Sequence, residues 1–145
     1  MRLSSVLALR RHDMSESRRP TILVVDDNHD NADIIRQYLE AHGYPIAVAY
    51  DGDEALAQFE TVRPSLVLLD VMMPGRDGWE VCRIMKQHPV LGSAVRIVMV
   101  TALDEWSDKR QALQTGADDY VEKPVDLPRL VKTVERNVAM LRPHV

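Results

Sequence analysis

Short apolar runs alternate with stretches of helical periodicity along the chain from residue 20 onward. Most of the runs are continuous, which is typical of strands that are buried on both faces of a sheet. The predicted strands cover residues 22–25, 46–50, 66–69, 95–100 and 119–122. Five such strands, each followed by a helical segment, predict a domain in which strand and helix alternate strictly.

Between the predicted strands, apolar side chains recur at the three- and four-residue spacing of amphipathic helices. These apolar positions are Ile34, Ile35, Tyr38 and Leu39, then Ala55, Leu56, Phe59 and Val62, then Val81, Cys82, Ile84 and Met85, and finally Leu127, Leu130, Val131, Val134, Val138 and Leu141. A further helix is predicted from about residue 104 to 115. Gly43, Pro64 and Gly116 are natural helix stops, and Pro128 stands in a first helical turn, where proline is tolerated.

This alternation predicts a doubly wound α/β fold. Continuous apolar strands need cover on both faces, so we expect a parallel sheet with helices on each side. In such a sheet the functional crevice lies beyond the carboxyl ends of the strands. We expect the domain to span residues 21–142, after a disordered basic leader at 1–20 and before a tail at 143–145.

Composition narrows the class of protein. The chain has 145 residues, of which 46% are hydrophobic and 28% are charged, as in an ordinary globular domain. Its net charge of −4 argues against a dedicated nucleic-acid binder, and no apolar run approaches the length of a membrane helix. A single cysteine, Cys82, excludes an internal disulfide and fits a reducing compartment. We therefore expect a cytoplasmic protein without nucleic-acid or membrane partners, in which Cys82 is buried.

Polar side chains end four of the predicted strands. Asp26 and Asp27 follow the first strand, Asp70 the third, Thr101 the fourth and Lys123 the fifth. In a parallel sheet these side chains converge on one edge, where three carboxylates repel one another unless a cation lies between them. Oxygen ligands with a vacant face suit Mg²⁺. A lysine and a hydroxyl beside such a metal can receive the oxygens of a phosphoryl group, and aspartate is an accepted nucleophile for its transfer.

Four segments give the chain a specific resemblance. They are ILVVDDN at 22–28, LLDVMMPGRDG at 68–78, VMVTA at 98–102 and GADDYVEKP at 116–124. Together they resemble the receiver domain of bacterial two-component response regulators, the family to which the chemotaxis response regulator belongs. The resemblance covers nearly the whole chain. It implies a flavodoxin-like (βα)5 fold, with a five-stranded parallel sheet in the order 2-1-3-4-5 and helices on both faces.

The resemblance implies a phospho-acceptor site. Asp70 is the expected phosphorylation site. Asp26, Asp27 and Asp70, together with the backbone carbonyl of Met72, are the expected Mg²⁺ ligands. Lys123 is expected to pair with the phosphate. Beyond its own phosphorylation and dephosphorylation, we expect no enzymatic activity.

A second group of residues is expected to transmit phosphorylation. By the resemblance, Thr101 hydrogen-bonds a phosphoryl oxygen, and Tyr120 rotates to follow it, as in a two-state switch. The Lys123–Pro124 peptide bond is cis in this family. Trp106 falls off the apolar stripe of its predicted helix, so it is either packed or exposed on a partner surface that includes Tyr120.

The resemblance also implies partners. A sensor histidine kinase or a histidine phosphotransfer protein is the expected phosphoryl donor, and its docking place is the first helix, around Asn31, Asp33 and Arg36. Because the last predicted helix ends near residue 141, we expect no output domain within this sequence. A downstream protein target would then read the phosphorylated state, or phosphorylation would drive homodimer formation.

Three other functions use related architectures. A degenerate receiver binds partners without phosphorylation, but the complete set of site residues argues against it. A small aspartate-nucleophile phosphohydrolase needs a second aspartate two residues after the nucleophile, where this chain has Met72. A flavin- or nucleotide-binding module needs a glycine- or hydroxyl-rich loop after the first strand, where Asp26 and Asp27 would repel phosphate. Taken alone, Asp26 also fits a simple helix cap.

The phosphorylated state should lose its phosphate slowly without help from a partner. In the family this lifetime depends partly on positions such as Met72 and Leu103, where apolar side chains leave an attacking water without a positioning partner. Loss of the phosphoryl group from the isolated protein, followed by intact mass after removal of the donor, measures the lifetime. A half-life of seconds would contradict the expectation.

Overall fold

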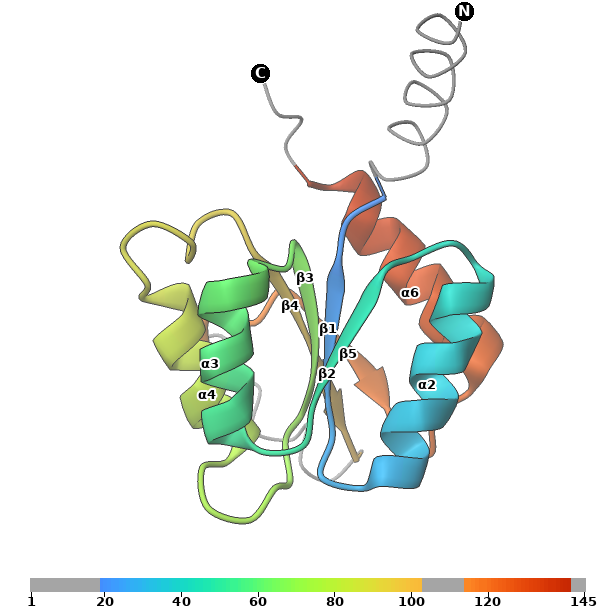
Figure 1. The fold of residues 1–145 in the computed structure, drawn as a ribbon, viewed down its shortest axis with the longest axis horizontal. Coiled ribbons are helices and arrows are strands. Elements are labelled where there is room, and N and C mark those ends of the chain that lie inside the picture. Colours follow the sequence, from blue (N-terminus) through green and yellow to red (C-terminus); the bar gives the residue numbers. More distant parts are fainter. Residues whose placement is uncertain (1–18, 103–113, 142–145) are drawn as a thin grey trace, which may run out of the picture.

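The computed structural model describes residues 19–102 and 114–141. The strands are β1 (Ile22–Val25), β2 (Ile46–Ala49), β3 (Leu66–Asp70), β4 (Arg96–Thr101) and β5 (Asp119–Glu122), and the helices are α2 (His29–Ala41), α3 (Gly52–Val62), α4 (Gly78–Lys86) and α6 (Leu127–Ala139) (Figure 1). Most of the predicted leader, the tail and the predicted helix from 104, with Trp106, lie outside the described residues. In the described part of the chain, no helix is long and apolar enough to cross a membrane.

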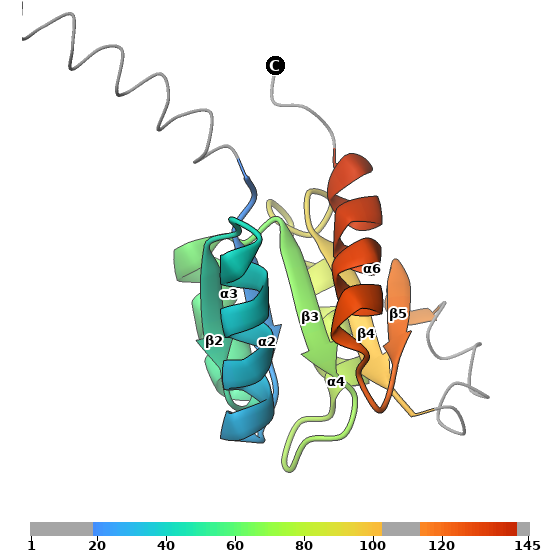
Figure 2. The ribbon, with the colours of Figure 1, turned by 90° about the vertical axis from the view of Figure 1, so that its right-hand side faces the viewer.

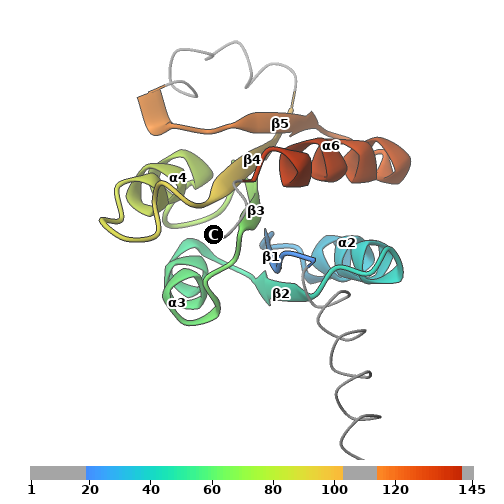
Figure 3. The ribbon, with the colours of Figure 1, turned by 90° about the horizontal axis from the view of Figure 1, so that it is seen from above.

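The five strands form one parallel sheet in the order β2-β1-β3-β4-β5, which confirms the predicted topology (Figure 2 and Figure 3). Helices α3 and α4 cover one face of this sheet, and α2 and α6 cover the other (Figure 3). The register aligns Val25 of β1 with Leu69 of β3, so the carboxyl ends of these two neighbouring strands reach the same level. This alignment brings the residues that follow the two strands to one edge of the sheet.

The sheet separates two hydrophobic cores, because successive side chains of a strand point to opposite faces. In β1, Leu23 and Val25 belong to the core under α3 and α4, whereas Ile22 and Val24 belong to the core under α2 and α6. All four side chains are at most 2% exposed. The continuous apolar runs of the sequence therefore reflect burial on both faces of the sheet.

Two predicted core positions are wrong. Ile34 is 52% exposed and Ile84 is 36% exposed, although each was placed in the apolar stripe of its helix. In α2 the buried side chains are Ala32, Ile35 and Leu39, and a residue next to this stripe is turned away by about 100°. Ile84 lies at the side of α4, where it lines a surface pocket.

Asp119 connects the beginning of β5 to α6 at the edge of the sheet. Its Oδ2 accepts hydrogen bonds from Arg136 Nη2 at 2.7 Å and Asn137 Nδ2 at 2.9 Å, and its Oδ1 accepts the Tyr120 N–H at 2.9 Å. Asn137 is buried, and its Oδ1 accepts a hydrogen bond from Arg96 Nε at 3.0 Å. Because Arg96 is the first residue of β4, this bond connects α6 to β4 as well. Burial by itself raises the pKa of Asp119, but these hydrogen bonds outweigh it and hold the pKa below its ordinary value.

We expect Asp119→Asn to lower the free energy of unfolding near neutral pH by about 1–2 kcal/mol, because hydrogen bonds to a charged group are lost. A depressed pKa in the folded state stabilises the protein above the unfolded pKa, and this stability is lost as the pH falls through the folded value. The difference between wild type and variant should therefore shrink under acid. Urea denaturation at pH 7 and at about pH 3 measures it. An equal difference at both pH values would contradict the role of the charge.

Candidate functional site

Three carboxylates meet at the carboxyl ends of β1 and β3. Carboxylate oxygens of Asp26, Asp27 and Asp70 all lie within 4.8 Å of one another. Asp26 and Asp70 are buried, whereas Asp27 is exposed. The strand register produces this cluster, since Val25 pairs with Leu69 and the next residues of both strands are acidic. The structure thus brings together the three side chains predicted to hold a metal.

Asp26 does not cap the helix that follows it. The N-cap of α2 is Asn28, whose side chain accepts the Asn31 N–H at 3.0 Å. Asp26 Oδ1 accepts the Asn28 N–H at 2.9 Å, which orients the carboxylate. Burial is the largest influence on Asp26 and raises its pKa; the neighbouring Asp27 acts in the same direction, against the Asn28 hydrogen bond and the charge of Lys123.

Asp70 is the most enclosed carboxylate of the cluster. Its side chain is 5% exposed, and its Oδ1 accepts a hydrogen bond from Lys123 Nζ at 2.5 Å. Burial raises the pKa of Asp70 and Asp26 adds to this effect, although the Lys123 ammonium and the Met72 N–H act against it. Two buried carboxylates, Asp26 and Asp70, thus lie beside one ammonium group, that of Lys123, an arrangement that a further cation would balance.

The donor set fits a hard divalent cation. Carboxylate oxygens from Asp26, Asp27 and Asp70 are the ligands that Mg²⁺ and Ca²⁺ favour, and the described part of the site contributes neither thiol nor imidazole to this cluster. Met72 follows Asp70 by two residues in the β3–α4 loop, and its side chain is 62% exposed. The position of Met72 is compatible with the predicted carbonyl ligand, which stays a prediction.

Thr101 and Lys123 are joined through their backbones. Thr101 is the last residue of β4 and is fully buried, and its carbonyl accepts the Lys123 N–H at 2.8 Å. The Lys123–Pro124 peptide bond is cis. Lys123 thus approaches Asp70 from the end of β5, while Thr101 stands at the end of the strand between them.

Tyr120 lies on the same face of the sheet as Thr101. Tyr120 pairs with Met99 across β4 and β5 and packs, half-buried, against the core under α3 and α4. Met99 belongs to this core, and Thr101 shares its face because side chains two apart in a strand point to the same side. This placement is compatible with the predicted coupling of the two residues. Trp106, the other predicted surface residue, lies outside the described residues.

Gly78 lets the start of α4 lie against the end of β3, where Asp70 stands. A Cβ atom on Gly78 would lie 2.2 Å from the backbone oxygen of Asp70 and 2.8 Å from the Cα of Val71. The Gly78 N–H also donates to the Val71 carbonyl at 2.9 Å. Only glycine permits the start of α4 to pack this closely on the end of β3. A glycine in the sequence does not reveal such a contact by itself.

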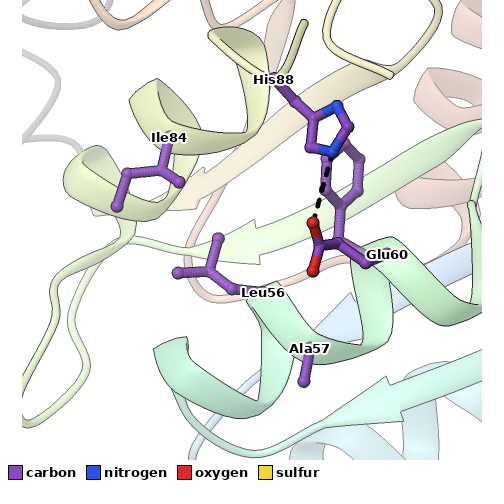
Figure 4. Close-up of a pocket in the computed structure, with 6 residues that line it drawn as sticks. Leu56, Ala57, Glu60, Ile84 and His88 are labelled. Atoms are coloured by element: carbon purple, nitrogen blue, oxygen red, sulfur yellow. Dashed lines mark ion pairs between the residues drawn. The ribbon is translucent and has the colours of Figure 1, made fainter. Parts of the chain in front are cut away.

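A separate pocket lies between α3 and α4 (Figure 4). It is lined by Leu56, Ala57, Phe59, Glu60, Ile84 and His88. His88 Nε2 stands 3.4 Å from Glu60 Oε1, while His88 Nδ1 accepts the N–H groups of Val90 and Leu91. The ring of His88 also packs edge-on against Phe59. None of the residues predicted for the acidic site lines this pocket.

Comparisons with known proteins agree with this geometry. The model of the response regulator receiver domain matches residues 22–135. The chain is similar to the solved structure of the chemotaxis protein CheY4 of Vibrio cholerae. The two share 28% sequence identity and a TM-score of 0.77, and the match covers 81% of this chain and 98% of that one. It is also similar to the receiver domain of NtrX from Brucella abortus, with 35% identity, a TM-score of 0.72 and coverage of 82% and 98%. The receiver domain of a signal transduction histidine kinase from Syntrophus aciditrophicus gives 31% identity, a TM-score of 0.78 and coverage of 87% and 95%.

Removing one carboxylate from the cluster should stabilise the metal-free protein. We expect Asp26→Asn to raise the midpoint of thermal unfolding by a few degrees near neutral pH. The pKa of Asp26 is raised in the folded state, so wild-type stability falls as the pH rises from the unfolded pKa of about 3.9 through the folded value. The amide avoids this loss, and its oxygen can still accept the Asn28 N–H.

Thermal unfolding with a chelator present, at neutral pH and below about pH 4, checks this prediction. The advantage of the variant should vanish where the carboxyl group of Asp26 is protonated in both the folded and the unfolded protein. Asp30→Asn is the matched control. It removes an exposed carboxylate four residues away and should not raise the midpoint, because an acidic side chain in the first turn of α2 is favourable. A variant that is less stable than wild type at neutral pH would contradict the account of the cluster.

Proposed function

Because the chain belongs to the family of response regulator receiver domains, we propose that it is a phospho-acceptor signalling switch that carries its phosphoryl group on Asp70. Receiver domains are signalling modules that interact with histidine kinases and downstream effectors. The observation that carries the proposal is the buried Asp70 carboxylate, with Lys123 Nζ at 2.5 Å and the carboxylates of Asp26 and Asp27 beside it. Phosphoryl transfer needs a placed nucleophile and concentrated positive charge, which Lys123 and a cation held by the three carboxylates would supply together.

The proposed metal is Mg²⁺, held by Asp26, Asp27, Asp70 and the backbone carbonyl of Met72. When bound, it supplies positive charge for the oxygens of the nucleophile and of the phosphoryl group. The raised pKa values of Asp26 and Asp70 support this assignment, because the ionised carboxylates lack full compensation from the protein alone. Asp27 is exposed and leaves one side of the cluster open to an incoming phosphoryl group.

In the proposed reaction, one oxygen of the Asp70 carboxylate attacks the phosphorus of a phosphohistidine. A P–O bond forms, the P–N bond breaks, and the donor imidazole keeps the electron pair. The product is an acyl phosphate on Asp70. Lys123 gives up its hydrogen bond to Asp70 Oδ1 and pairs with a phosphoryl oxygen. The hydroxyl group of Thr101 donates a hydrogen bond to another phosphoryl oxygen, and Tyr120 follows the threonine toward the interior.

The phosphoryl donor that we propose is a sensor histidine kinase or a histidine phosphotransfer protein, and a downstream protein would read the resulting change. The partner face through Tyr120, the phosphorylation-dependent dimer and the cytoplasmic location expected from the sequence stay predictions. A phosphohydrolase is disfavoured, because position 72 carries a methionine that is 62% exposed and has no acid or base to offer.

Asp70→Asn should abolish phosphorylation. Incubation with acetyl phosphate and Mg²⁺, followed by intact mass, should show the addition of one phosphoryl group to wild type and none to the variant. Binding of a beryllofluoride mimic, followed by tryptophan fluorescence, should require Mg²⁺ and Asp70 in the same way.

Asp30→Asn serves again as the control, since it removes one nearby carboxylate from the exposed surface of α2 and should leave the phosphorylation yield intact. Lys123→Ala should lower the extent of the fluorescence response while phosphorylation still occurs, because the lysine pairs with the phosphate and is not the acceptor. Phosphorylation that survives Asp70→Asn would remove the central claim.

A further inference from the structure

The loop between β3 and α4 carries Met72, the proposed carbonyl ligand. Hydrogen bonds hold the two ends of this loop: the Val71 N–H donates to the Val100 carbonyl at 3.1 Å, and the Gly78 N–H donates to the Val71 carbonyl at 2.9 Å. Residues 72–77 lie between these bonds. The position of the Met72 carbonyl therefore depends on the contacts that hold residues 72–77 in place, because a metal ligand on a loop moves with the loop.

Arg76 is the side chain of this loop that reaches two other elements. Its Nε donates to Asp53 Oδ1 at 2.7 Å, and its Nη1 donates to Glu80 Oε1 at 2.9 Å. Asp53 lies in the first turn of α3, 23 residues earlier in the chain, and Glu80 lies in the first turn of α4. The guanidinium thus joins the loop to the beginnings of α3 and α4, the described helices that cover this face of the sheet.

Gly52 gives independent support for this contact. A Cβ atom on Gly52 would lie 2.8 Å from the Cβ of Arg76 and 3.4 Å from its backbone oxygen, and 3.0 Å from a methyl group of Val81. The loop therefore packs directly on the backbone of α3 at the residue next to Asp53. Close packing and the ion pair act at the same place, on the same residue of the loop.

These contacts are suited to positioning and not to global stability. Arg76 is 41% exposed, and Asp53 and Glu80 are 83% and 40% exposed, so each ion pair contributes little to the free energy of unfolding. A small free energy is still enough to restrict a short loop whose two ends are already fixed. The restriction acts on residues 72–77 and hence on the Met72 carbonyl.

We propose that Arg76 is a positioning residue that sets the affinity for Mg²⁺ by fastening the β3–α4 loop to α3 and α4. The inference rests on the proposed function, because it assumes that Mg²⁺ binds at the acidic cluster. It makes the first turn of α3, which contributes no predicted ligand, part of the machinery of the site.

Three variants separate positioning from simple charge. Arg76→Gln removes a positive charge and Asp53→Asn removes a negative charge. Gly52→Ala changes no charge, but its added methyl group would displace the loop at Arg76. If Arg76 acts by position, all three should weaken Mg²⁺ binding. Arg76→Gln, which removes two exposed ion pairs, should weaken it by about threefold to tenfold. If only the electrostatic field matters, Arg76→Gln should tighten binding, Asp53→Asn should weaken it and Gly52→Ala should leave it unchanged.

Titration calorimetry with Mg²⁺ alone measures the dissociation constants, and thermal unfolding verifies that each variant is folded. Arg83→Gln is the charge-matched control, because it removes one exposed positive charge from α4 without contact to the loop among the described residues. Arg76→Lys should restore part of the affinity lost in Arg76→Gln. Tighter binding by Arg76→Gln, or wild-type affinity in both Arg76→Gln and Gly52→Ala, would overturn the inference.

The proposed function can fail separately. If wild type binds no Mg²⁺, or if Asp70→Asn binds it as well as wild type does, the acidic cluster is not the metal site and the proposed function falls. If wild type binds in an Asp70-dependent manner and the three variants match it, only the role of Arg76 falls.

Discussion

Two carboxylates buried at the carboxyl ends of β1 and β3 impose the main constraint on the rest of the structure. Asp26 and Asp70 lie side by side with low exposure, and Lys123 alone does not compensate their charge. A fold that was optimised for stability would not hold acidic groups in this way. The surrounding elements are therefore best understood as the means by which an unfavourable arrangement is kept in place.

Several parts of the fold hold the two buried carboxylates in place without contacting their side chains. The parallel register between β1 and β3 sets their separation, and Gly78 lets α4 begin directly against the Asp70 backbone. At the other end of the sheet, the hydrogen bonds of Asp119 to α6 hold the start of β5, the strand that ends beside Lys123. Stabilising hydrogen bonds such as those of Asp119 thus lie away from the site, while repulsion between like charges lies within it.

Much of this could be predicted from the sequence, and the limits have physical causes. Strand positions and topology follow from continuous apolar runs, and the cluster follows because polar residues directly succeed those runs. The burial of Cys82 was predicted as well; its Sγ lies 3.6 Å from the Thr115 carbonyl, and burial raises its pKa to about 11. By contrast, Ile34 shows that an apolar residue beside a helical stripe is not necessarily buried.

Contacts between residues far apart in sequence could not be predicted in this way. The bond between Arg76 and Asp53 spans 23 residues and depends on how a loop lies on a helix, which periodicity does not describe. The close approach of Gly78 to Asp70 likewise depends on backbone paths and not on side-chain pattern. Such contacts determine how well a site is built, whereas the residue types determine what it can bind.

The hydrogen bond between the Lys123 N–H and the Thr101 carbonyl has a consequence for how the domain would move. It links the backbones of Lys123 and Thr101, at the ends of β5 and β4, so that a shift of one residue is expected to move the other. Among the described strands, β5 has β4 as its one neighbour in the sheet and is four residues long, as is β2 at the opposite edge. A change at Asp70 that moves Lys123 therefore acts on an edge of the sheet, and the inner strands β1 and β3 need not shift with it.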